Sequence, residues 1–195
     1  LGSFLNVTFA PGEKNALIRA TIQKALDIDP NLGEAYAARA INRCYYDWDF
    51  AGAESDYRRA IELVPSNATA HHWYAEFLSM QGRFDKSYRE YDKAISLDPL
   101  SMAIKTDLAL AHFYARDHDG SMELLKKVKA IDPHFLRTEN YIFWIHRVKG
   151  EYKLAIDSLE RFYAMEADNG AREDRQEVMG RINRFRREFA ENGVT

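Results

Sequence analysis

The stretch Ala-Ile-Ser-Leu-Asp-Pro at residues 94–99 decides the fold, because close copies of it recur along the chain at a nearly constant interval. Ala-Leu-Asp-Ile-Asp-Pro occupies 25–30, Ala-Ile-Glu-Leu-Val-Pro occupies 60–65, and Val-Lys-Ala-Ile-Asp-Pro occupies 128–133. The prolines at 30, 65, 99 and 133 are evenly spaced, except that the first interval is longer than the next two by one position. A further interval reaches Glu-Ala-Asp at 166–168, where the proline is absent but the phase is kept. A fixed period of this length indicates a chain built from repeated structural units.

Each period divides into two amphipathic helical stretches separated by a short turn. In residues 66–99, apolar and aromatic side chains recur at helical spacing on both sides of Gly82. Gly150 interrupts residues 134–168 in the same way. Because glycine readily ends a helix and proline cannot continue one, each period predicts an antiparallel helical hairpin. A single hairpin cannot bury its apolar face, so neighbouring hairpins are expected to stack.

Composition and charge exclude several classes of protein. The chain has 195 residues, of which 46% are hydrophobic and 29% charged, as in a folded globular protein. Its formal net charge of -3 argues against a general nucleic-acid binder, which needs a basic surface. No run of 18 apolar residues is present, so no membrane-spanning helix is expected. The single cysteine, Cys44, cannot form an internal disulfide.

The periodic residues resemble the tetratricopeptide repeat family over about residues 1–168. That family repeats about every 34 residues, with small and bulky side chains at set positions. In residues 66–99, Tyr74 and Ala75 match the large–small pair of the first helix, and Ala94 matches the series of the second helix. Matching residues in the other units include Ala40, Ala53, Tyr57, Ala60, Ala109, Ser121, Leu125 and Ala155. The resemblance implies an all-α fold, a right-handed α-solenoid of antiparallel helix hairpins.

We expect about four full repeats, a half repeat before them and a capping helix after them. The repeat array is expected over 1–170, with a partial repeat at 1–30 and full repeats at 31–65, 66–99, 100–133 and 134–168. We place the extra residue of the first interval in the turn formed by residues 46–49. Because a solenoid normally ends in a polar cap, half a hairpin at the start leads us to expect a fragment of a longer protein.

Residues 171–195 are expected to form the C-terminal capping helix and a tail. An apolar stripe within them would cover the last hairpin, and it consists of Val178, Ile182, Phe185 and Phe189. Arginines in this segment are interspersed with acidic residues, which favours a solvated helix with charge pairs over a nucleic-acid face.

The search for catalytic and cofactor chemistry is negative. The sequence contains no glycine-rich phosphate loop, nucleophile elbow or His-Glu-x-x-His motif, so we predict no enzyme, no cofactor and no metal site. His112, Asp117 and His118 are metal-ligand types, but both histidines fall at packing positions, which favours a structural role over a zinc site. Cys44 lies near Asp47, an anion that does not activate a thiol.

What remains is a binding surface, which the resemblance places on the concave face lined by the first helix of each hairpin. The candidate partner-binding residues are Tyr45, His72, Trp73, Glu76, Asp107, Phe113, Tyr114, Asn140, Tyr141, Trp144 and Arg147. Aromatic anchors with a polar rim favour recognition of a peptide or protein. The alternative is that neighbouring helices cover part of this aromatic stripe. Acidic Glu76 and Asp107, with Arg147 further on, predict a partner that is basic at one end and acidic at the other.

The leading prediction is a non-enzymatic scaffold that binds a peptide or protein partner through this surface. Residues 45–54 and 68–75 are also similar to repeat regions of bacterial signalling proteins. That similarity implies an alternative, a ligand-sensing or self-associating module of a larger transcription regulator, cyclase or kinase, which allows a homo-oligomer. An RNA-binding helical array stays as a third class, although its basic groove is missing. We expect no membrane contact and a cytoplasmic location, or alternatively the periplasmic part of a membrane-anchored regulator.

Overall fold

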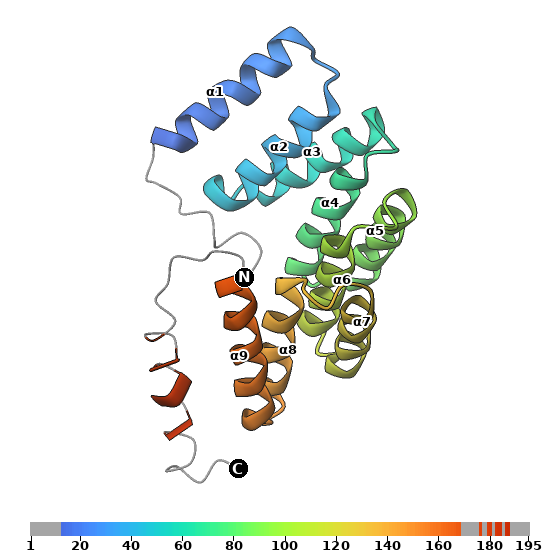
Figure 1. Ribbon diagram of the computed structural model, residues 1–195. Helices are drawn as coiled ribbons and strands as arrows, with labels where there is room; N and C mark the ends of the chain where they lie inside the picture. The colour runs from blue at the N-terminus through green and yellow to red at the C-terminus, as the bar shows by residue number, and fades with distance from the viewer. Residues whose placement is uncertain (1–12, 169–175, 177–178, 181, 185, 188–195) are drawn as a thin grey trace. The chain divides into compact units, whose positions relative to one another are not determined.

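The computed structural model describes residues 13–168, 176, 179–180, 182–184 and 186–187. Within these ranges every regular element is a helix, which confirms the expected all-α fold (Figure 1). The elements are α1 (Glu13–Ile28), α2 (Gly33–Asn42), the π-helical turn η1 (Arg43–Asp47), α3 (Phe50–Leu63), α4 (Ala68–Met80), α5 (Phe84–Leu97), α6 (Met102–Tyr114), α7 (His118–Ile131), α8 (Leu136–Val148) and α9 (Tyr152–Asp168).

The chain divides into two compact units, one ending at Asp107 and the other beginning at Leu108, within α6. In the first unit α2 packs on α3, and α4 packs on α5, as two helical hairpins. In the second unit α8 packs on α9, and Leu125 of α7 shares a buried cluster with Ala109 of α6. Helices α2 to α9 therefore come in pairs, and α1 precedes the first pair.

A left-handed residue follows the first helix of every hairpin and reverses the chain. These residues are Trp48, Gly82, Arg116 and Gly150, with φ of 55°, 70°, 65° and 75°. Each of these four residues is separated from the next by the same number of positions along the chain. In the three later hairpins the next amide donates to a carbonyl five residues back, as Arg83 does to Leu78 at 2.9 Å. This hydrogen bond satisfies a carbonyl at the helix end, which is the usual benefit of a left-handed cap.

The first hairpin holds its extra residue inside the helix, which corrects the expected placement in the turn at 46–49. The segment from Pro30 to Trp48 is longer by one position than the segment from Pro65 to Gly82 and its two later equivalents. The added residue lies in η1, and the Asp49 amide reaches back six residues to the Arg43 carbonyl at 3.0 Å. A π-helical turn adds one residue without breaking the hydrogen-bonded helix, so the turn that follows keeps its geometry.

Small residues allow the two helices of a hairpin to cross closely. Ser87 Oγ donates to the Ala75 carbonyl at 2.7 Å, and Ser121 Oγ donates to the Ala109 carbonyl at 2.6 Å. All four residues are buried. Because the first-helix residue is only a methyl group, the hydroxyl of the second helix reaches the backbone directly. The alanine of the large–small pair is thus explained by a repeated interhelical hydrogen bond.

An ion-pair network joins consecutive hairpins of the first unit. The Glu54 carboxylate of α3 accepts hydrogen bonds from Arg83, just before α5, at 2.7 and 2.9 Å. It also accepts from Tyr74 Oη at 3.1 Å and from Arg58 at 2.7 Å. The Arg83 guanidinium is the main reason that the pKa of Glu54 falls to about 2.

The two ends of the predicted array are described only in part. Residues 1–12 and, in the predicted capping helix, Val178, Phe185 and Phe189 lie outside the described residues. Ile182 is described and buried, and it packs with Ile156, Leu159 and Tyr163 of α9. Arg186 forms an ion pair with Glu160 at 2.7 Å.

Replacement of Ala75 by Leu is expected to destabilise the protein. The larger side chain must enter the crossing where Ala75 has no exposed surface and accepts the Ser87 hydrogen bond. We expect the free energy of unfolding to fall by about 1–3 kcal/mol. Urea denaturation followed by circular dichroism measures this change. The control is Ala130→Leu on the exposed side of α7, and equal stability of both variants would contradict the crossing described above.

Two turn variants are expected to change stability in opposite directions. Gly82→Ala forces a side chain into φ 70°, although its Cβ meets no atom within 4 Å, so the cost of about 1 kcal/mol is purely conformational. Arg116→Gly relieves the same strain at φ 65°, and we expect a gain of about 0.5 kcal/mol. Thermal unfolding of both variants tests the pair. Destabilisation by both would show that the Arg116 side chain matters more than its backbone conformation.

Replacement of Glu54 by Gln is expected to remove a pH-dependent part of the stability. The pKa of Glu54 is lowered from 4.5 to about 2, so its contribution is complete above pH 4.5 and is lost as the pH falls toward 2. Glu54→Gln should therefore lower the free energy of unfolding by about 1 kcal/mol at neutral pH, with the difference shrinking below pH 4.5.

Urea denaturation of both proteins across this pH range measures the effect. Glu62→Gln on the same helix is the matched control, because Glu62 is exposed and its carboxylate lies 3.3 Å from Arg59. A pH-independent difference between wild type and Glu54→Gln would contradict the role of the ion pair.

Candidate interaction surface

In the first unit, the predicted partner-binding residues lie on η1, α4 and the beginning of α6. Tyr45 of η1 is 36% exposed, and its hydroxyl donates to Met80 Sδ at 3.5 Å. Trp73 of α4 is half-buried and packs against the cluster of Ala37, Ala60 and Ala70. The indole therefore stabilises the contact between consecutive hairpins as well as contributing surface.

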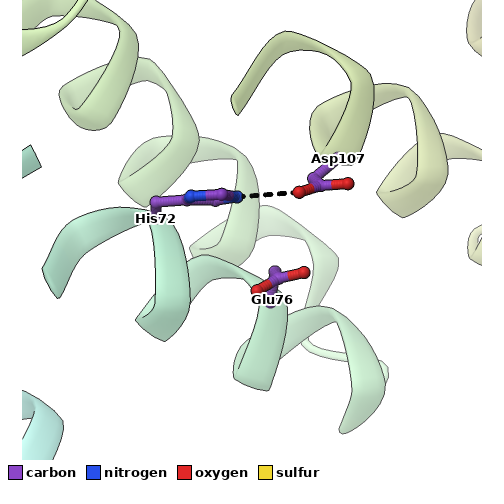
Figure 2. A group of neighbouring side chains, drawn as sticks. All are labelled: His72, Glu76 and Asp107. Carbon is purple, nitrogen blue, oxygen red and sulfur yellow. Dashed lines mark hydrogen bonds and ion pairs between the residues drawn. The ribbon is translucent and has the colours of Figure 1, made fainter. Parts of the chain in front are cut away.

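His72, Glu76 and Asp107 converge within the same unit (Figure 2). The His72 ring nitrogen Nε2 lies 3.0 Å from Asp107 Oδ2. Asp107 is only 1% exposed, so its carboxylate is a poor contact for an incoming partner. Glu76 lies one turn after His72 on α4 and completes the group. These three residues, predicted separately as surface positions, form one polar cluster between α4 and α6.

The Cys44 thiol interacts electrostatically with Glu76 of this cluster and is held in its protonated form. Burial raises the pKa of its thiol to about 11, and the negative charge of Glu76 adds to the shift. A thiol with this pKa stays protonated and is a weak nucleophile and metal ligand.

In the second unit, the predicted residues divide between the core and the surface of α6 and α8. Tyr141 is 4% exposed and belongs to the core cluster with Ala109 and Ile145. Phe113 packs partly against the same cluster, and Tyr114 and Asn140 are half-buried. Part of the predicted aromatic stripe is therefore covered within the unit, and Tyr141 offers little surface to a partner.

Trp144 and Arg147 of α8 form the most accessible pair of the predicted set. The Trp144 side chain is 40% exposed, and the Arg147 guanidinium lies 5.0 Å from the centre of its ring. Phe143 contacts the same ring edge-on at 5.1 Å. Val148, one turn further along α8, is 52% exposed. The result is an exposed apolar strip flanked by a positive charge.

One exposed aromatic pair is missing from the residues predicted from sequence. Trp48 is 74% exposed and packs edge-on against Phe50 with 6.1 Å between ring centres. The sequence could have indicated that Trp48 lies at a surface turn, because it occupies the repeat position that Gly82 and Gly150 occupy in other hairpins. All three residues have the left-handed backbone conformation.

His112 and Asp117, considered above as zinc ligands, are hydrogen-bonded to each other at the start of α7. Asp117 Oδ1 accepts the Gly120 amide at 3.0 Å and so caps α7, and Asp117 Oδ2 lies 2.8 Å from His112 Nδ1. The hydrogen bond with His112 is the main reason that the pKa of Asp117 is lowered. No third metal-type ligand joins this pair among the residues that the structure describes.

None of the described helices is both long enough and apolar enough to cross a membrane.

Comparison with known proteins identifies the repeats. Two family models described as tetratricopeptide repeat match residues 56–88 and 81–134. Protein O-mannosyl-transferase Tmtc2 from Drosophila melanogaster is 37% identical over 59 residues, which are 30% of this chain and 6% of that protein. The chain thus spans a small part of this relative, whose activity belongs to the whole protein.

Three solved structures share the fold at low identity. PilW, a type IV pilus biogenesis factor, has a TM-score of 0.69 and 21% identity over 79% of this chain and 71% of its own. Pseudomonas aeruginosa PilF has a TM-score of 0.65 and 21% identity, covering 93% and 79%. MamA has a TM-score of 0.61 and 20% identity, covering 84% and 99%. These likenesses show the fold, an α-solenoid of helical hairpins. Tetratricopeptide repeat proteins are generally non-catalytic scaffolds, and residues 56–134 of this chain match the tetratricopeptide repeat family.

Proposed function

We propose that this chain is a non-enzymatic scaffold that binds a peptide or protein partner through the first-helix faces of its hairpins. The observation that carries the proposal is the exposed pair of Trp144 and Arg147 on α8. Tryptophan and arginine are the residue types that most often dominate binding energy at protein interfaces. A ring already stacked by a guanidinium is held in place before binding, which lowers the entropy lost on association.

The chemistry of this surface defines the part of the partner that it would contact. Trp144 and Val148 offer apolar area along one side of α8. The Arg147 guanidinium suits a carboxylate, which it can bind through two parallel hydrogen bonds. A segment with an apolar side chain next to an acidic residue or a terminal carboxylate fits this strip. In the first unit, exposed Tyr45 and Met80 supply a second apolar contact, whereas buried Asp107 is left out.

The repeat boundaries at 31–65, 66–99, 100–133 and 134–168 are part of the same proposal. Each of these ranges contains one pair of helices, from α2 and α3 to α8 and α9. In each pair the first helix carries the residues proposed to face a partner, and the second helix supports it.

Variants on α8 test the proposal with peptides selected from a random phage-displayed library against the intact chain. Selected peptides are expected to carry an acidic residue beside an apolar one. Trp144→Ala and Arg147→Glu should each weaken their binding by about 2 kcal/mol, or roughly 30-fold in dissociation constant. Trp73→Ala should weaken peptides that contact the first unit. Isothermal titration calorimetry measures the dissociation constants, and circular dichroism confirms that each variant is folded.

Lys127→Glu is the matched control, because it reverses a charge on an exposed position of the second helix α7. Its binding should equal that of wild type. Undiminished binding by all three first-helix variants would contradict the proposal. Sedimentation of the chain alone over a range of concentrations tests the alternative of a self-associating module, which predicts a mass that rises with concentration.

A further inference from the structure

We propose that His72, Glu76 and Asp107 bind a divalent transition-metal ion, with Zn²⁺ as the reference ion. One ligand atom from each residue lies within 4.8 Å of the other two. Figure 2 shows the His72 ring edge directed at Asp107, with Glu76 beside them. This proposal goes beyond the scaffold function and does not depend on it.

The spacing of the ligands follows from the helices that carry them. His72 and Glu76 are one helical turn apart on α4, so their side chains lie on the same face of that helix. Asp107 comes from α6, the first helix of the following hairpin, where it occupies the repeat position that Trp73 occupies in α4. A bound ion would therefore link two consecutive first helices in the first unit.

The donor set favours a transition metal over Mg²⁺ or Ca²⁺. One imidazole nitrogen and two carboxylate oxygens suit Zn²⁺ and similar ions, whereas Mg²⁺ and Ca²⁺ prefer oxygen alone. Two donors bound to tetrahedral zinc are separated by about 3.3 Å, since each lies about 2.0–2.1 Å from the ion. The 3.0 Å between His72 Nε2 and Asp107 Oδ2 is close to this separation. Rotation of the Glu76 side chain would bring the third donor into place.

The surroundings of the cluster also suit a cation. Asp107 is 1% exposed, and the His72 side chain is 12% exposed. Glu76 is half-buried beside them, and a bound dication would be attracted by the negative charges of both carboxylates. The buried Tyr91 ring lies 6.0 Å from the His72 ring and limits how the imidazole can turn. Three protein ligands leave a fourth position for water or for a side chain of another molecule.

The first test is titration of the metal-free intact chain with Zn²⁺ by isothermal calorimetry. One ion is expected to bind per chain. His72→Gln and Glu76→Gln should each weaken binding by about tenfold or more, because each removes one ligand. His112→Gln is the matched control, because it removes a histidine from another His–Asp pair, which lacks a third ligand among the described residues. It should leave Zn²⁺ affinity unchanged.

Two further measurements separate a built site from adventitious binding. Zn²⁺ should raise the melting temperature of wild type and of His112→Gln but not that of His72→Gln, because an ion that binds only the folded chain stabilises it. Co²⁺ in place of Zn²⁺ should give visible absorption bands in wild type that are lost in Glu76→Gln. Circular dichroism without metal shows that each variant is folded.

Three results would overturn the proposal. They are the absence of Zn²⁺ binding by the wild type, equal Zn²⁺ affinity of His72→Gln and wild type, and Ca²⁺ binding as tight as that of Zn²⁺. The α8 variants test the scaffold function alone. Their effect on peptide binding has no bearing on whether the chain binds Zn²⁺. The two proposals therefore succeed or fail separately.

Discussion

The close crossing of the two helices in the first three hairpins is the constraint on which the rest of the structure depends, whereas the last hairpin carries Phe143 at the equivalent position. At Ala75 and Ala109 the first helix presents only a methyl group, and a serine hydroxyl of the second helix reaches the backbone carbonyl. Alanine fills the crossing again at Ala40 and Ala53 of the first hairpin, where neither residue is exposed. Because the same crossing recurs, the larger residues around it repeat their positions, and consecutive hairpins present equivalent faces.

Equivalent faces explain how an interaction surface and a polar cluster arise from the same positions. Where one hairpin places Trp73 against the apolar cluster of its neighbour, the next places Asp107, whose carboxylate meets His72. The same repeat position thus carries an apolar contact in one hairpin and a charged one in the next. The α8 strip of Trp144 and Arg147 arises in the same way, on a first helix whose inner face is filled by Ile142 and Ile145.

The turns show that the backbone period is kept more strictly than the sequence. Four left-handed residues recur at one constant interval although only two of them are glycine, and the extra residue of the first hairpin is taken up inside the helix by η1. The turn geometry is retained because it fixes the direction in which the second helix returns to the first. Trp48 is held exposed as a consequence, since its backbone must serve the turn while its side chain finds no pocket.

The sequence by itself determined the helical hairpins, their period and the buried residues of the crossing, because proline, glycine and apolar spacing act locally along each helix. It also indicated which positions belong to the first-helix face. Only the tertiary structure decided which of those positions stay accessible. Tyr141 lies in a core while Trp144, further along the same helix, is 40% exposed, because burial depends on the neighbouring helix rather than on the spacing within one. His72, Glu76 and Asp107 likewise form a cluster only because α4 and α6 come together in the fold. Asp107 lies far from the other two along the chain, so the sequence alone does not show that the three are neighbours.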